Sequence, residues 1–129
     1  ASGGELSRIM LAMKSAMSDK KGAQTVIFDE IDTGVSGSTS QKIGIKLCNI
    51  SKLTQTICVT HSAQIAALAD AHYFIKKQEV DERAEAHVFF LDSEQRVDEI
   101  ARIIAGMDVT DKQFAAAKEL IKQSNALKG

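Results

Sequence analysis

The sequence between residues 24 and 30 is Gln24-Thr25-Val26-Ile27-Phe28-Asp29-Glu30, an apolar run that ends in two adjacent carboxylates. A short run of β-branched and aromatic residues is typical of a buried strand, so a strand is predicted over residues 24–29. A second run of this kind, residues 55–60, ends immediately before His61. Between the two runs, apolar positions that recur at helical spacing predict a helix over residues 38–52.

The order strand, helix, strand, helix, strand is typical of a parallel sheet with helices on its faces. Ser62 is a suitable cap for a short second helix. Further strands are predicted over residues 72–79 and 85–91, joined by a polar turn over residues 81–83. Two helices complete the chain, and Gly106 ends the first of them. The predicted fold class is therefore α/β, mainly a parallel sheet with flanking helices.

The bulk composition sets only broad limits on function. The chain has 129 residues, which suits one domain, and its net charge of −1 gives no electrostatic reason to bind nucleic acid or an anionic membrane. No stretch approaches the ~20 apolar residues that span a bilayer, so no membrane association is expected. Cys48 and Cys58 lack metal-ligand spacing and are interpreted as reduced thiols of a cytosolic protein. The charged residues between 92 and 102 are interpreted as a solvated helix face.

Asp29 and Glu30 stand where a parallel sheet places its chemistry, beyond the carboxyl end of a strand. The simplest interpretation is a loop that happens to be acidic. In the functional interpretation, Asp29 holds Mg²⁺ through water, because Mg²⁺ keeps most of its hydration shell. Glu30 points elsewhere and would take a proton from an attacking water, and general-base catalysis of this kind contributes roughly 10²–10⁴-fold in rate.

His61 follows the second predicted strand and is expected to lie beside Asp29 and Glu30, because the carboxyl ends of parallel strands meet at one edge. A lone histidine is more often structural or solvated. The strand-end position favours a functional role here, in which the imidazole reaches a terminal phosphate. His72 and His87 lie within or at the start of predicted strands and are interpreted as structural.

The chain begins with Ala1-Ser2-Gly3-Gly4-Glu5-Leu6, just before a helix predicted over residues 5–18. Ser2 and Glu5 match the S-x-x-E capping box, and a plain helix cap is the simplest interpretation. A helix N-terminus also presents unpaired amides and partial positive charge, and two glycines let a phosphate approach the backbone closely. Ser2, Gly3 and Gly4 are therefore also candidates for binding a phosphate of another molecule.

Together, these three motifs resemble the carboxyl-terminal half of an ABC ATPase head, and within that superfamily the RecN family of SMC-like bacterial DNA repair proteins. The residues that carry the resemblance are Ala1-Ser2-Gly3-Gly4-Glu5-Leu6-Ser7-Arg8, Phe28-Asp29-Glu30-Ile31-Asp32-Thr33-Gly34-Val35-Ser36-Gly37, Val59-Thr60-His61-Ser62-Ala63-Gln64-Ile65-Ala66 and Glu99-Ile100-Ala101-Arg102 with Gly106. The resemblance covers essentially the whole chain. It implies that residues 1–129 are the carboxyl-terminal part of an ABC/SMC-type head with a P-loop NTPase-like fold.

The resemblance implies a role for each motif. Asp29 would be the Walker B acid that orders Mg²⁺, Glu30 the base for the hydrolytic water, and His61 the switch histidine that contacts the γ-phosphate of ATP. The signature motif would cap ATP bound on the opposing head of a homodimer, and its residues are Ser2, Gly3, Gly4 and Glu5. The implied function is ATP hydrolysis in recombinational repair of DNA double-strand breaks. It also implies a bacterial cytoplasmic location at the nucleoid, with DNA bound through the full-length protein.

The chain contains no phosphate-binding loop of the G-x-x-x-x-G-K-[ST] type, the Walker A motif. The resemblance places that loop in the amino-terminal half of the same head, so this half is expected as a partner. The chain alone is then expected neither to bind ATP tightly nor to hydrolyse it. Because it starts inside a motif without methionine, the chain is interpreted as a fragment of a longer protein. Ser36 stands where many ABC proteins have an aspartate, and neither Ser36 nor Asp32 is assigned a role.

Two other functions fit the motifs less well. A nucleotide-binding subunit of a membrane transporter usually reads D-E-P after the strand and closes its signature with glutamine, whereas this chain has Ile31 and Glu5. A non-catalytic interaction domain that kept the fold is the third interpretation. The presence of Glu30 argues against it, because an inactive site has no need of that carboxylate.

Overall fold

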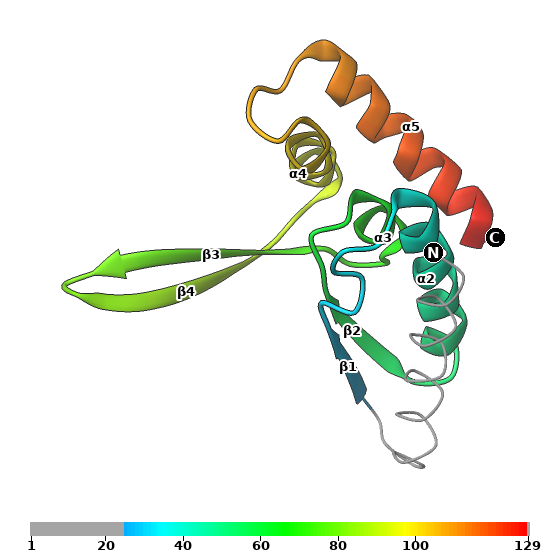
Figure 1. The fold of residues 1–129 in the computed structure, drawn as a ribbon, viewed down its shortest axis with the longest axis horizontal. Coiled ribbons are helices and arrows are strands. Elements are labelled where there is room, and N and C mark those ends of the chain that lie inside the picture. The colour runs from blue at the N-terminus through cyan, green and yellow to red at the C-terminus, as the bar shows by residue number, and fades with distance from the viewer. Residues whose placement is uncertain (1–24, 129) are drawn as a thin grey trace.

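The structure is a computed structural model, and it describes residues 25–128. The helix predicted over residues 5–18 and the motif from Ser2 to Glu5 therefore lie outside the described residues. The described part begins with a parallel pair of strands, β1 (Thr25–Asp29) and β2 (Gln55–Val59). The connection between them passes through α2 (Gly37–Ser51), which confirms the predicted strand–helix–strand unit (Figure 1).

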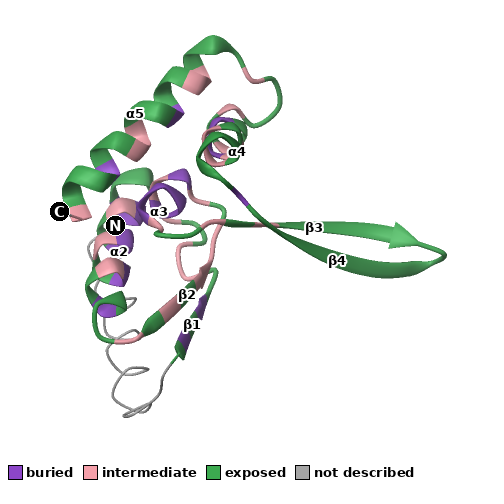
Figure 2. Cartoon of the chain, turned by 180° about the vertical axis from the view of Figure 1, so that it is seen from behind, coloured by how far each residue is buried: buried purple, intermediate pink, exposed green. Residues whose placement is uncertain are grey.

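The parallel pair has one covered face and one open face. Val26 and Phe28 on β1 are buried, whereas Ile27 between them is 65% exposed and its register partner Ile57 on β2 is 44% exposed (Figure 2). Strand side chains alternate between faces, so α2 covers only the face that carries Val26 and Phe28. The other members of this first core are Ile43, Leu47, Ile50 and Ile65. The open face therefore presents apolar side chains to solvent.

A long antiparallel hairpin projects from the body of the molecule (Figure 1). It consists of β3 (Tyr73–Val80) and β4 (Arg83–Phe90), which form a sheet of their own. Both strands were predictable, but the expectation that a third strand extends the parallel sheet is wrong. The turn has only two residues, Asp81 and Glu82, with φ of 51° and 65°. So short a connection joins antiparallel neighbours only, and β4 therefore pairs with β3.

The hairpin is exposed along almost its whole length. Phe74 is the one half-buried residue of β3, and every residue of β4 is exposed. At the base of one face, Tyr73 packs edge-on against Phe90, with ring centroids 5.3 Å apart. Phe74 lies on the opposite face, where the Arg102 guanidinium sits 5.7 Å from its ring centroid. The hairpin is thus attached to the rest of the fold mainly through its base.

Three helices form the rest of the molecule: α3 (Ala63–Leu68), α4 (Ser93–Ala105) and α5 (Asp111–Lys128). They share a second apolar core built largely of alanine, whose small side chain lets helices approach closely. Its buried members are Ala63, Ala66, Ala67, Ile100, Ala101 and Ala117. The helices predicted after the hairpin are therefore confirmed. Within residues 25–128, no helix combines the length and apolar character that crossing a membrane requires.

Arg96 departs from the solvated helix face predicted for residues 92–102. The side chain is half-buried, and its Nη2 donates to the carbonyl oxygens of Ala66 and Ala69 at 3.1 and 3.0 Å. The last carbonyl groups of a helix have no partner within the helix, so Arg96 of α4 caps the end of α3. Glu99 is also mostly covered, with 14% of its side chain exposed, and pairs with Arg102. The sequence pattern did not reveal the burial of Arg96 because its hydrogen-bond partners lie at the end of another helix, α3.

Candidate active site

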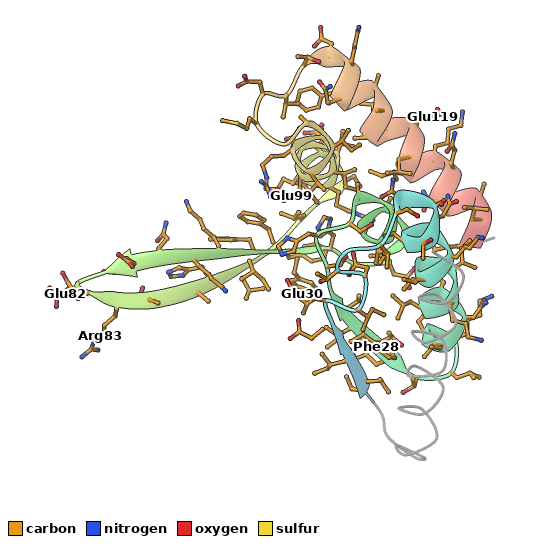
Figure 3. All side chains as sticks on the ribbon, viewed as in Figure 1. Phe28, Glu30, Glu82, Arg83, Glu99 and Glu119 are labelled. Atoms are coloured by element: carbon orange, nitrogen blue, oxygen red, sulfur yellow. The ribbon has the colours of Figure 1, made fainter. Side chains whose placement is uncertain are left out.

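Glu30 and His61 lie side by side just past the carboxyl ends of β1 and β2, as the strand-end argument predicts, and Asp29 is the last residue of β1. The Glu30 amide donates to the Val59 carbonyl oxygen at 2.8 Å, which continues the β1–β2 hydrogen bonding one residue past β1. His61 follows the end of β2 after a single intervening residue. Figure 3 shows Glu30 at the end of β1, where the strand enters the loop that leads to α2.

The side chains of Glu30 and His61 are in direct contact. Glu30 Oε1 lies 3.0 Å from His61 Nε2, and 48% of the Glu30 side chain and 89% of the His61 side chain are exposed. Glu30 has a φ of 51°, in the left-handed region that costs a residue with a side chain about 1–2 kcal/mol. Such strain is often found at functional sites. The edge of the sheet therefore presents a carboxylate and an imidazole, side by side, to solvent.

Asp29 lies on the open face of the parallel pair. It follows Ile27 by two residues, which places both side chains on the same side of the strand, and it is exposed. An exposed carboxylate has room for the hydration shell that Mg²⁺ retains. Among residues 25–128, no three or more His, Cys, Asp or Glu side chains gather as a metal site. The described residues would therefore supply few of the ligands of such an ion.

The loop between β1 and α2 is ordered by its own hydrogen bonds. The amide and the hydroxyl of Thr33 both donate to the Glu30 carbonyl oxygen, at 3.3 and 2.9 Å. Ser36 is the N-cap of α2 and accepts a hydrogen bond from the Thr39 amide at 3.3 Å. Ser36, which the sequence left without a role, therefore starts the helix that follows the loop.

Gly34 provides a test of this loop geometry. Its φ is 80°, and a Cβ placed there would meet no atom within 4 Å. Gly34→Ala should therefore lower the free energy of unfolding by about 1–2 kcal/mol through backbone strain alone. Gly37→Ala is the matched control, because Gly37 begins α2 without a positive φ and its added Cβ would meet only the flexible Gln64 side chain. Equal losses in urea unfolding of the two variants would contradict the loop conformation.

Asp32 and Thr60 connect the loops that carry Glu30 and His61. The Thr60 hydroxyl donates to Asp32 Oδ2 at 2.7 Å, and the Ser62 amide donates to Thr60 Oγ1 at 3.0 Å. Both side chains are half-buried. This pair was not predicted, because its only signal in the sequence is position: Asp32 stands two residues after Glu30, and Thr60 directly precedes His61.

The thiols and the other histidines lie outside the contact between Glu30 and His61. Cys48 and Cys58 are both free, as predicted. Burial raises the pKa of the Cys58 thiol to about 11, and the nearby carboxylates of Asp32 and Asp29 add to this effect, so the thiol stays protonated at neutral pH. Burial, helped by the charge of Arg96, lowers the pKa of His72. His87 lies on the exposed hairpin, 3.4 Å from Glu85.

Comparison with known proteins shows that the chain is similar to part of bacterial DNA repair proteins. No protein-family model matches it. The DNA repair proteins RecN of Halalkalibacterium halodurans and Bacillus subtilis are each 48% identical to it over 128 residues, 99% of the chain. RecN of Rickettsia conorii is 45% identical over 121 residues. The chain spans only 23%, 22% and 22% of the length of these three relatives.

The fold has a solved counterpart among SMC ATPases. A structure from a study of ATP-driven dimerization and DNA-stimulated activation of SMC ATPases superposes with a TM-score of 0.59. The match covers 81% of this chain and 61% of the other, at 23% sequence identity. The described residues thus share an α/β fold with that structure, which is consistent with a P-loop NTPase-like lobe. Nearly the whole chain is homologous to a segment that makes up about a fifth of the length of these RecN DNA repair proteins.

Proposed function

We propose that this chain is the carboxyl-terminal part of the ATP-binding and ATP-hydrolysing head of a RecN-like protein that acts in recombinational repair of DNA double-strand breaks. The observation that carries the proposal is the contact between Glu30 and His61 at the edge of the parallel pair, 3.0 Å apart. The RecN relatives and the SMC-type fold support the same conclusion. The similarity of the chain to RecN suggests a role in DNA repair, which the geometry of the site alone does not indicate.

Each of the three edge residues has a role that its surroundings suit. Asp29, exposed on the open face, would hold Mg²⁺ through water, and the ion would supply charge neutralisation for the phosphates of ATP. Glu30 would take the proton of the attacking water. His61 would donate a hydrogen bond to the γ-phosphate, for which its side chain, 89% exposed, is accessible.

The head needs partners to complete this site. The amino-terminal half, with the Walker A loop, would bind most of the triphosphate, and the open face with Ile27 and Ile57 suits contact with further protein. A second head would add Ser2, Gly3, Gly4 and Glu5 over the nucleotide, because two heads sandwich two ATP molecules. DNA would bind through the full-length protein, at the nucleoid in the bacterial cytoplasm.

The alternative functions have less support. A transporter subunit is disfavoured by Ile31 and Glu5 in the motifs and by relatives that are DNA repair proteins. A non-catalytic interaction domain would have no use for a carboxylate held in a strained backbone conformation beside an exposed imidazole. ATP turnover by the full-length protein separates these possibilities.

Replacing His61 by alanine tests the proposed role of the imidazole. Loss of one hydrogen-bond donor to a developing charge typically costs roughly 10²-fold in kcat, and we expect a loss of this size in full-length protein. His87→Ala is the matched control, because His87 also pairs with a glutamate but lies on the exposed hairpin. The measurement is steady-state ATP hydrolysis. Equal turnover by the His61→Ala and His87→Ala variants would remove the support for an ATPase site here.

A further inference from the structure

The side chain of His61 has little around it to fix its position. It is 89% exposed, and it contacts Glu30, whose own side chain is 48% exposed. An exposed pair of this kind contributes little energy by itself. The placement of the imidazole must therefore come mainly from the backbone of the loop that carries it.

That backbone is held on both sides of His61 by the hydroxyl of Thr60. The Ser62 amide donates to Thr60 Oγ1 at 3.0 Å, so one hydroxyl bridges the residues immediately before and after His61. Serine and threonine hydroxyls often form turns of this type with the amide two residues on. The loop continues directly into α3, where Ser62 is the N-cap.

The Thr60 hydroxyl is in turn oriented by Asp32. A hydroxyl has one proton, and here it is donated to Asp32 Oδ2 at 2.7 Å, which leaves the oxygen lone pairs free to accept from the Ser62 amide. Hydrogen bonds linked in this way strengthen one another, and a charged acceptor strengthens them further. Asp32 belongs to the loop of Glu30, whose carbonyl oxygen accepts both hydrogen bonds of Thr33.

We propose that Asp32 and Thr60 form a positioning clamp that fixes His61 relative to Glu30. The clamp joins the two loops through side chains 28 residues apart in the sequence. The proposal rests on the proposed ATPase function for its kinetic consequence, but not for its structural one. Neither residue is proposed to touch ATP; both act through the placement of His61.

The kinetic test uses the full-length protein. Thr60→Val removes the hydroxyl but keeps the branched shape, and it should lower kcat roughly 10- to 100-fold through misplacement of His61. The KM for ATP should change much less, because the clamp does not contact nucleotide. Thr60→Ser retains the hydroxyl and should restore kcat to within about twofold of wild type. The double variant Asp32→Ala/Thr60→Val should be no slower than the slower single variant, since both break the same connection.

A second measurement is independent of ATP. The Ser62 amide loses its acceptor in Thr60→Val, so hydrogen exchange at residues 60–63 should become faster, and Thr60→Ser should leave it unchanged. Wild-type kcat in Thr60→Val, or additive losses in the double variant, would overturn the clamp. If His61→Ala leaves turnover intact, the proposed function fails separately. The rate of hydrogen exchange at residues 60–63 then still tests whether the clamp exists, and an unchanged rate in Thr60→Val would overturn the clamp.

Discussion

Glu30→Gln is expected to lower the rate of ATP hydrolysis by the full-length protein by roughly 10²–10⁴-fold, the usual contribution of a general base. Glutamine has nearly the shape of glutamate, so its side-chain oxygen can keep the contact with His61. It cannot accept the proton of the attacking water. Nucleotide binding should therefore persist, and the variant should trap ATP together with the dimer of heads.

The control for this experiment is Glu85→Gln. Glu85 is a second exposed glutamate beside a histidine, 3.4 Å from His87 and 50% exposed, but it lies on the hairpin. Its substitution should leave turnover unchanged. If Glu30→Gln hydrolyses ATP as fast as Glu85→Gln, Glu30 is not the base, and a non-catalytic interaction domain becomes the better interpretation.

Ile100→Ala is expected to lower the free energy of unfolding by about 2–5 kcal/mol. Ile100 is 0% exposed in the alanine-rich core shared by α3, α4 and α5. Truncation there removes buried methyl and methylene groups and leaves a cavity, because helices already in close contact at Ala101 and Ala117 have little freedom to collapse further.

Ile104→Ala provides the comparison within the same helix. Ile104 stands one turn further along α4 and is 40% exposed, so the same substitution removes less buried surface. Its expected cost is about 1 kcal/mol or less. Urea unfolding of the two variants measures the difference. Similar losses at the two positions would mean that the packing of α4 against α3 and α5 is not as described.

The parallel pair and its edge were predictable because they depend on local patterns. An apolar run between turn residues predicts a strand, although only one face of this pair is covered, and chemistry at the carboxyl end follows from the connectivity of parallel sheets. Glu30 and His61 therefore came together as predicted. Their roles towards ATP, and those of Asp29 and of Ser2 to Glu5, stay predictions.

The features that the sequence did not disclose all depend on partners distant along the chain. The pairing of β4 with β3 outweighed extension of the parallel sheet, because a two-residue turn brings β4 to the edge of β3. Arg96 reaches carbonyl groups 27 and 30 residues away, and Asp32 reaches Thr60 across 28 residues. Single side-chain hydrogen bonds between loops or helices leave no periodic trace in a sequence.

The edge-on packing of Tyr73 against Phe90 has a spectroscopic consequence. Tyr73 is the only tyrosine of the chain, and the chain has no tryptophan to dominate the emission. Intrinsic ultraviolet fluorescence of this segment therefore originates at the base of the hairpin. Any event that reorients the hairpin can be followed there optically, without attaching a dye.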